Sequence, residues 1–309
     1  MSGAPLIYYT HPLFLQHDTG LGHPECPDRL RVINSALSRP EFSALIHKEA
    51  PRATREQIEL VHTTDYIARL QSLAPNSGRV YLDGDTPLSP ASLDAAWHAA
   101  GACCEAVDAA CSAPDTRAFC AVRPPGHHAE PDQGMGFCLF NNVAIAAAWA
   151  LHQHRLERVA VIDFDVHHGN GTAAAFTNQP ALLYVSTHQH PCYPDTGASM
   201  QSGTGNILNI PLPAGTDSMR FRSAITWRLL PALRNFKPQL ILISAGFDAH
   251  RLDPLAKINL ETCDYGWLTE QLMQVALQYA QGRIVSVLEG GYHLEALADS
   301  VVEHIKALI

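Results

Sequence analysis

Acidic and histidine side chains gather directly after an apolar run at residues 159–162. Asp163, Asp165 and His167 follow this run at intervals of two residues. The run consists of β-branched and small residues, which is typical of a strand buried on both faces of a parallel sheet. Because side chains alternate along a strand, the three polar residues should project to the same side at its carboxyl end. Open α/β sheets bind their ligands at that end, so the pattern predicts a metal site.

Asp248 follows a second apolar run, at residues 239–244, and completes a candidate ligand set. Asp165, His167 and Asp248 together offer two carboxylates and one imidazole. This set leaves a coordination position open, as a catalytic zinc site requires, and it would also suit iron(II). The spacing of Asp165 and His167 alone is equally compatible with a capped, hydrogen-bonded turn. The addition of Asp248 and of further polar turns favours the metal interpretation.

Two of these polar turns carry groups that could transfer protons. His127 and His128 are adjacent in a loop of proline and glycine, where they have no evident structural purpose. We interpret them as acid–base groups whose pKa values are set by partners, and Asp163 and Asn170 could supply one partner each. Tyr292 lies in a Gly-Gly turn that could bring its hydroxyl over a substrate, although an ordinary half-buried tyrosine is the alternative interpretation.

The order of the predicted elements indicates the fold class. Apolar runs predict strands at residues 6–9, 118–122, 159–162, 182–187, 207–211, 239–244 and 284–288. Amphipathic or apolar patterns predict helices at residues 27–37, 91–111, 142–152, 217–236 and 262–281. Strands that alternate with helices in this way are typical of a doubly wound parallel sheet. No internal repeat or linker divides the chain, so we expect one domain over residues 1–309.

The composition excludes several classes of partner. The chain has 309 residues and a formal net charge of −9, with 21 Lys and Arg residues, so it offers no broad basic face to nucleic acid. No apolar run approaches the ~20 residues of a membrane-spanning helix, and the first residues lack the charged-then-apolar order of a signal peptide. The eight cysteines form no CxxC pair and no disulfide framework. We therefore expect a cytoplasmic protein with free thiols and no membrane partner.

Five segments occur in an order that resembles the zinc-dependent histone deacetylase family. They are residues 123–128, 136–138, 163–171, 244–248 and 289–292. The sequence is most similar to class II-like members and to bacterial histone deacetylase-like amidohydrolases, and the resemblance extends from His23 almost to the C-terminus. It implies a single-domain arginase/deacetylase fold, an α/β architecture in which a parallel sheet of about eight strands is flanked by helices.

The resemblance also implies two kinds of metal ion. One zinc ion per chain would bind Asp165, His167 and Asp248, with iron(II) as the alternative metal. A structural potassium ion would be held by Asp163, the backbone carbonyls of Asp165 and His167, Ser186 and Thr187.

The resemblance assigns a role to each acid–base group. His128 would take a proton from the attacking water and later protonate the leaving amine, and Asn170 would orient it. His127 would stay largely protonated beside Asp163. Class I members usually have Asp at the position of Asn170, so the neutral partner here should make His128 harder to protonate. Tyr292 would donate a hydrogen bond to the scissile carbonyl and stabilise the oxyanion.

The resemblance further implies a narrow substrate tunnel. Phe137 and Tyr193 would form its aromatic walls. The backbone of Gly136 or Gly290 could accept a hydrogen bond from the substrate amide, and Asp85 could accept one from a peptide backbone. Such a tunnel is sized for an aliphatic side chain that ends in an acyl group.

The choice of substrate rests on the tunnel mouth. Leu255 occupies the gatekeeper position, where polyamine-selective members tend to carry an acidic residue. This favours acylated lysine in peptides or proteins, with acetyl as the default, over acetylpolyamines and other acylated small amines. The nearest rival enzyme is a two-manganese ureohydrolase of the same fold, but its second metal would need a carboxylate where this chain has Gly169. A protein that only binds acylated ligands is a third interpretation, and the intact set of candidate residues argues against it.

Overall fold

The polar residues singled out above lie at the carboxyl ends of strands in one central sheet. The computed structural model describes residues 6–309, so the first five residues, which lack the pattern of a signal peptide, lie outside the described part. The strand order is β2-β1-β5-β11-β10-β6-β7-β9-β8. The first eight strands in this order pair in parallel, and β8 pairs antiparallel with β9. The prediction of a parallel sheet of about eight strands is confirmed.

The described elements have the following bounds. The strands of the central sheet are β1 (Leu6–Thr10), β2 (Ile46–Glu49), β5 (Arg117–Cys120), β6 (Val159–Asp163), β7 (Leu182–Gln189), β8 (Gln201–Ser202), β9 (Ile207–Leu212), β10 (Leu240–Ala245) and β11 (Ile284–Leu288). A separate antiparallel hairpin consists of β3 (Val80–Tyr81) and β4 (Pro87–Leu88). The α-helices are α1 (Asp28–Leu37), α2 (Arg55–Glu59), α3 (Thr64–Leu73), α4 (Ser92–Ser112), α5 (Asn142–His154), α6 (Asn170–Phe176), α7 (Ser218–Ala224), α8 (Leu230–Phe236), α9 (Thr262–Tyr279) and α10 (Leu294–Leu308). Two short 3₁₀-helices span Pro12–Leu15 and Pro40–Phe42.

β6 and β10 lie side by side within the sheet because their sequences are apolar on both faces. Every residue of Val159–Asp163 and of Leu240–Ala245 is buried. The two strands pair in parallel, with Asp163 opposite Ser244. Both strands therefore leave the sheet at the same end, and the loop that follows each of them carries candidate metal ligands.

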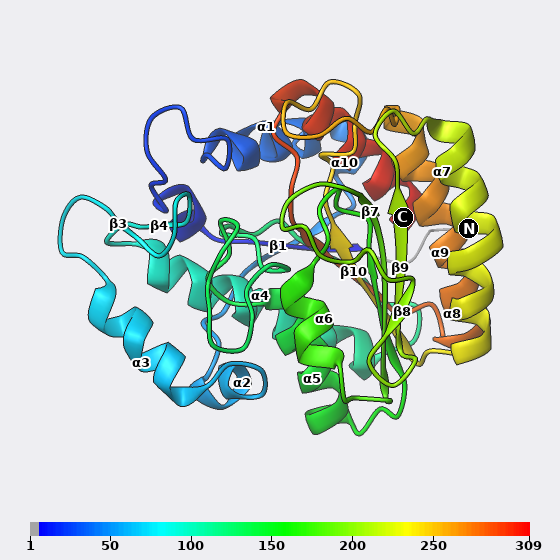
Figure 1. Cartoon of the computed structure of the whole chain (residues 1–309), viewed down its shortest axis with the longest axis horizontal. Coiled ribbons are helices and arrows are strands. Elements are labelled where there is room, and N and C mark those ends of the chain that lie inside the picture. The colour runs from blue at the N-terminus through cyan, green and yellow to red at the C-terminus, as the bar shows by residue number, and fades with distance from the viewer. Residues whose placement is uncertain (1–5) are drawn as a thin grey trace.

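Helices cover both faces of the sheet (Figure 1). α4 and α5 pack against each other on one face, and α1, α8, α9 and α10 pack together on the other. α10 is absent from the helices predicted above, although its buried Leu297, Val301 and Ile305 follow a helical spacing. Burial of such side chains stabilises the fold by ~1.5–3 kcal/mol each, so this helix closes its face of the sheet.

The structure differs from the predicted elements in a few further places. The helix predicted at residues 217–236 is helical from Ser218 to Phe236, with Asp217 as its N-cap, but a π-helical turn (Ile225–Leu229) separates α7 from α8. β2 and α3 are also absent from the predicted elements. Within residues 6–309, no helix is both long enough and apolar enough to cross a bilayer.

Candidate active site

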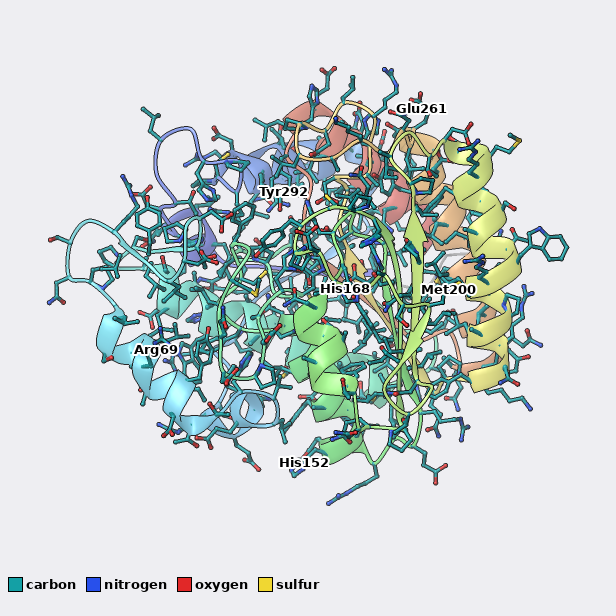
Figure 2. All side chains as sticks on the ribbon, viewed as in Figure 1. Arg69, His152, His168, Met200, Glu261 and Tyr292 are labelled. Atoms are coloured by element: carbon teal, nitrogen blue, oxygen red, sulfur yellow. The ribbon has the colours of Figure 1, made fainter. Side chains whose placement is uncertain are left out.

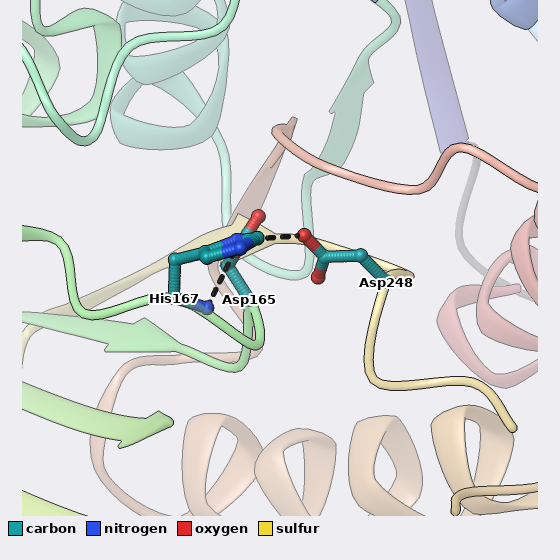
Figure 3. Close-up of side chains that lie close together, drawn as sticks. All are labelled: Asp165, His167 and Asp248. Atoms are coloured by element: carbon teal, nitrogen blue, oxygen red, sulfur yellow. Dashed lines mark hydrogen bonds and ion pairs between the residues drawn. The ribbon is translucent and has the colours of Figure 1, made fainter. Parts of the chain in front are cut away.

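The loops after β6 and β10 bring Asp165, His167 and Asp248 together (Figure 3). His167 Nδ1 lies 3.1 Å from Asp165 Oδ1 and 3.1 Å from Asp248 Oδ2. The ligand atoms of the three side chains all lie within 4.8 Å of one another, and all three residues are buried. The structure therefore places the three predicted metal ligands around one point.

Hydrogen bonds in the loop after β6 orient two of these ligands. β6 ends at Asp163, so Asp165 and His167 lie beyond the strand, and the prediction that strand alternation alone orients them is wrong. Asp163 Oδ1 accepts from the backbone N–H of Asp165 at 3.1 Å, and Asp165 Oδ1 accepts from that of His167 at 2.9 Å. Two consecutive side-chain-to-backbone turns thus fix the direction of Asp165 and His167.

The surroundings of the two carboxylates fit a divalent cation. The backbone N–H groups of Gly290 and Val166 donate to Asp165 Oδ2 and Asp248 Oδ1, both at 2.8 Å. The other carboxylate oxygen of each aspartate faces His167. A Cβ at Gly290 would lie 2.2 Å from Asp248 Oδ2, so a glycine is needed for this close approach. Two oriented carboxylates and one imidazole leave one side open and suit zinc or iron(II).

The buried charges of this cluster also favour a cation. Burial and the nearby Asp165 charge raise the pKa of Asp248 to about 7. Burial opposes ionisation of Asp165 too, but the His127 and His167 charges hold its pKa below the usual range. The pKa of His167 lies well above its ordinary value despite burial, because both carboxylates hydrogen-bond to it. In the metal-free protein a proton on His167 partly balances the carboxylates, and a metal ion would replace that proton.

His127 is held in its charged form by carboxylates on two sides. Its Nδ1 lies 3.0 Å from Asp163 Oδ2, and its Nε2 lies 3.8 Å from Asp165 Oδ1. Burial lowers its pKa, but the charges of Asp165 and Asp163 outweigh this effect and raise the pKa to about 10. Tyr184 Oη donates to Asp163 Oδ2 at 2.8 Å and steadies that carboxylate. This is the pairing with Asp163 that the resemblance implies.

His128 lies beside His127, but it is neutral at neutral pH whereas His127 is positively charged. Its Nδ1 lies 2.8 Å from Asn170 Oδ1. Burial, followed by the charges of His127 and His167, lowers its pKa well below the ordinary value. Burial and the two neighbouring charges cause this lowering, whereas the hydrogen bond to Asn170 acts in the opposite direction and raises the pKa of His128. His128 Nε2 makes no hydrogen bond within the described chain, so its lone pair is available to a ligand.

A buried carboxylate to which the sequence analysis assigns no role holds the His127 loop. Glu289 Oε2 accepts from the backbone N–H of Gly126 at 2.7 Å and of His127 at 3.2 Å. Ser244 Oγ donates to Glu289 Oε1 at 3.1 Å and ties this loop to β10. The signal for this role is the position of Glu289, a charged residue directly after the buried strand β11.

A cavity of about 230 Å³ opens beside the metal-ligand cluster. Its lining consists of Asp85, Pro125, His127, His128, Gly136, Phe137, Cys138, His167, Tyr193, Leu255, Gly290 and Tyr292. This list contains every residue predicted to bind substrate. It also contains the predicted catalytic residues His127, His128 and Tyr292. The other two predicted catalytic residues lie outside the lining, where Asp163 contacts His127 and Asn170 contacts His128.

Aromatic rings form much of the cavity wall. The Phe137 ring packs edge-on against Tyr292 with centroids 5.9 Å apart, and the Tyr193 ring packs edge-on against His128 at 5.1 Å. Gly136 has a φ of +56°, and a Cβ there would lie 2.6 Å from the His128 ring. Only glycine therefore lets the wall pass directly over His128.

Tyr292 follows β11 and lines the cavity, and it is one of the residues labelled in Figure 2. Its Oη makes no hydrogen bond within residues 6–309, and the Arg29 guanidinium lies 5.0 Å from its ring centroid. Burial raises the pKa of Tyr292 well above 10, so the hydroxyl keeps its proton at neutral pH. Asp253, which the sequence analysis did not single out, accepts from the backbone N–H groups of Tyr292 at 2.7 Å and Leu255 at 3.1 Å. One carboxylate therefore joins two walls of the cavity.

Comparisons with known proteins agree with this arrangement. The histone deacetylase domain family matches residues 23–308. A rice protein named histone deacetylase 10, chloroplastic, is 39% identical over 327 residues, covering 99% of this chain and 73% of the rice protein. A Pseudomonas aeruginosa protein named histone deacetylase-like amidohydrolase is 38% identical over 285 residues, covering 90% and 75%. The solved HDA15 HD domain matches with a TM-score of 0.92 and 31% identity, covering 99% of this chain and 89% of that one.

The family match spans nearly the whole described chain, and the fold agrees with it. The resemblance inferred from the five sequence segments is therefore confirmed. The chain belongs to the histone deacetylase family.

Proposed function

We propose that the chain is a zinc-dependent amidohydrolase that removes acyl groups, acetyl by default, from lysine side chains. Membership of the histone deacetylase family supports deacetylase chemistry in general. One observation carries the finer proposal. His128 and Tyr292 present groups without a partner in the described chain to the same cavity that the metal-ligand candidate His167 lines.

His128 would act first as the general base and then as the general acid. Zinc bound by Asp165, His167 and Asp248 would supply a Lewis acid for the acyl carbonyl and acidify a water molecule. His128 would accept a proton from the water at Nε2, because its Nδ1 is engaged with Asn170. The water oxygen would then bond to the acyl carbon. As the carbon–nitrogen bond breaks, His128 would return the proton to the departing amine.

Two further groups would stabilise the charge that develops on the acyl oxygen. Tyr292 keeps its proton at neutral pH and would donate it in a hydrogen bond. His127, with a pKa raised to about 10, would place a fixed positive charge beside the reacting groups. Both groups are held before substrate arrives, so little reorganisation is needed during the reaction.

Substitution of Tyr292 by Phe should lower kcat by ~10²–10³-fold, because one oxyanion donor is lost. KM should change little, since the phenyl ring keeps its packing against Phe137 and Arg29. Steady-state kinetics on an acetyl-lysine peptide measures both constants. Tyr279→Phe, at the end of α9 and outside the cavity lining, is the matched control. Unchanged turnover in Tyr292→Phe would show that Tyr292 is not the oxyanion donor and would revive the interpretation as a ligand-binding protein.

Substitution of Asp253 by Ala should weaken both stability and turnover. It removes the acceptor of the backbone N–H groups of Tyr292, His293 and Leu255. An unsatisfied buried donor costs ~1–3 kcal/mol, and the Tyr292 turn loses its anchor. Urea unfolding should show the stability loss, and kcat/KM should fall together with it. A variant of full stability and full kcat/KM would show that the carboxylate does not position Tyr292.

The apolar residue Leu255 at the cavity mouth supports acyl-lysine over acylpolyamine as the substrate. The residue is 37% exposed, so it can meet a substrate that enters the cavity. A panel of acyl-lysine peptides and acetylpolyamines tests the choice, and we expect the higher kcat/KM on acetyl-lysine peptides. Leu255→Glu should shift the ratio toward polyamines, because a carboxylate there attracts a remote ammonium. Equal or faster hydrolysis of polyamines by the unaltered protein would reverse the substrate assignment.

The two-manganese alternative lacks room for its second set of ligands. A Cβ at Gly169 would lie 2.4 Å from Tyr184 Oη and 2.5 Å from Asp163 Oδ2. A carboxylate side chain therefore cannot be placed there without moving two buried groups. Among the described residues, Asp165, His167 and Asp248 form the single cluster with metal-ligand spacing. Elemental analysis should accordingly find one zinc or iron(II) per chain, and two manganese ions would overturn the proposal.

Potassium and the cellular location complete the proposal. Asp163 and Ser186 are paired residues of β6 and β7, and the neighbouring Thr187 Oγ1 is buried without a hydrogen-bond partner. The pairing of Asp163 with Ser186 supports the predicted potassium ion, although Ser186 Oγ already contacts His188 at 2.8 Å. Thr187 Oγ1 adds no support, because adjacent side chains of a strand point to opposite faces of the sheet. All eight cysteines carry free thiols, which supports the proposed reducing, cytoplasmic location.

A further inference from the structure

Asn170 is itself held by a carboxylate that the proposed mechanism does not use. Its Nδ2 donates to Glu130 Oε1 at 2.7 Å, and its Oδ1 lies 2.8 Å from His128 Nδ1. Two weaker acceptors face the same Nδ2, the His128 carbonyl at 3.3 Å and Met135 Sδ at 3.4 Å. Asn170 therefore forms a bridge between Glu130 and His128.

The two ends of an amide side chain have nearly the same shape but opposite hydrogen-bonding roles. A carboxylate can only accept, so Glu130 requires the NH₂ group of Asn170 on its side. The amide oxygen is thereby turned toward His128 Nδ1, which must then carry the imidazole proton. This tautomer leaves the lone pair on Nε2, the nitrogen without a partner in the described chain, on a ring that lines the cavity. The opposite amide orientation would place the proton on Nε2 and remove the base.

Glu130 has no competing partner that would explain its position. It is half-buried, two residues after His128. Its backbone is fixed by a turn in which Glu130 N–H donates to the Gln133 carbonyl at 2.8 Å. Over residues 6–309, no Lys, Arg or His lies within ion-pair distance of its carboxylate, and Asn170 is the side chain that hydrogen-bonds to it. Glu130 is also outside the cavity lining, so it does not meet the substrate.

We infer that Glu130 is a positioning residue that fixes the tautomer of His128 by orienting the amide of Asn170. The inference rests on the proposed role of His128 as the base. It extends that role by naming the group that decides which imidazole nitrogen is free. Nothing in the sequence pattern around Asn170 indicates this partner, because 40 residues separate it from Glu130.

Three substitutions of Glu130 separate orientation from charge. Glu130→Gln keeps an acceptor but removes the charge, so kcat should stay close to that of the unaltered protein. Glu130→Leu removes the acceptor and should lower kcat by ~10–100-fold, as loss of an orienting partner typically does. Glu130→Lys presents a donor, which favours the reversed amide, and should lower kcat by up to ~10⁴-fold, the cost of a catalytic histidine in the wrong tautomer. KM should change little in all three.

The tautomer itself can be observed without turnover. ¹⁵N NMR of zinc-loaded, histidine-labelled protein, with His128→Ala to assign the signals, should show His128 protonated at Nδ1 in the unaltered protein and in Glu130→Gln. Glu130→Lys should move the proton to Nε2. Asp132→Lys is the matched control, since it makes the same charge change on an exposed side chain of the same loop.

The following results would overturn the inference that Glu130 fixes the tautomer of His128. A wild-type tautomer in both Glu130→Lys and Glu130→Leu overturns the inference, whether or not kcat falls. The same loss of kcat in Asp132→Lys as in Glu130→Lys also overturns it, because a general charge effect would then suffice. If Glu130→Lys does not fold, the comparison of Glu130→Leu with Glu130→Gln decides the question. Absence of amidohydrolase activity in the unaltered protein would instead refute the proposed function and leave the tautomer measurement standing.

Discussion

Removal of the metal should abolish turnover and lower the stability of the fold at the same time. Asp165, His167 and Asp248 converge within 4.8 Å in a buried site, so the chain alone holds two carboxylates there with one imidazole between them. A cation that binds the folded but not the unfolded chain stabilises the fold by about 4 kcal/mol when its free concentration is 1,000 times Kd. Thermal unfolding of chelator-treated protein with and without added zinc should show this shift, and activity should return with the metal.

The variant Asp248→Asn is the control for this experiment, because it removes one of the three proposed metal ligands. The folded-state pKa of Asp248, about 7, lies above the ordinary value of an aspartate, chiefly because of burial and then because of Asp165. Between pH ~4 and 7 the folded metal-free chain therefore holds a proton that the unfolded chain has lost, so this contribution to stability declines as the pH rises through that window. Metal-free Asp248→Asn should lack this decline and should also fail to respond to zinc.

Urea unfolding at pH 5 and pH 7 measures the effect as a difference between the two proteins, in which the titration of groups distant from Asp248 cancels. A zinc response that survives in Asp248→Asn, or full turnover in metal-free protein, would refute the metal site.

Some of the fold could be predicted from sequence because its signals are local. The strands β6, β10 and β11 are apolar on both faces, and their buried runs mark them without reference to any partner. β2 carries the sequence Ile-His-Lys-Glu and is exposed at every position, so it pairs with β1 without an apolar signal of its own. α10 is different, since its buried residues follow a clear helical period that the sequence analysis did not use.

The site shows the same division between local and distant causes. The meeting of Asp165 with Asp248 could be predicted because parallel strands leave a sheet at one end. The roles of Glu130 and Asp253 could not, because each depends on hydrogen bonds to residues that are tens of positions away. A carboxylate in a loop has no periodicity, and its partner is decided only when the loops pack together. Sequence patterns thus identified the residues that line the cavity better than the carboxylates that hold them.

Substitution of His128 by Ala should lower kcat by ~10²–10⁴-fold, the usual contribution of a positioned general base. His128 Nε2 has no partner in the described chain and its ring lines the cavity, so its removal takes away the proposed proton acceptor. His152→Ala, on the exposed face of α5, is the matched control and should leave kcat unchanged. Turnover retained in His128→Ala would assign the base elsewhere, with His127 as the next candidate.

The pH dependence of turnover tests the same assignment without removing the side chain. The pKa of His128 is held well below 6.5 by burial and then by the charges of His127 and His167. His128 is therefore neutral and competent at pH 6.5, where a histidine of ordinary pKa would be about half protonated. The acid limb of the kcat profile that belongs to His128 should accordingly lie below pH 6.5.

Asn170→Asp should move this limb to higher pH, because a carboxylate 2.8 Å from Nδ1 favours the charged imidazole. The new carboxylate would also face Glu130, whose oxygen lies 2.7 Å from the amide nitrogen that Asn170 supplies, and like charges so close oppose ionisation. The double variant Asn170→Asp/Glu130→Gln removes that repulsion, so its acid limb should lie at a higher pH than that of Asn170→Asp alone. An acid limb that stays in place in both variants would show that its pKa does not belong to His128.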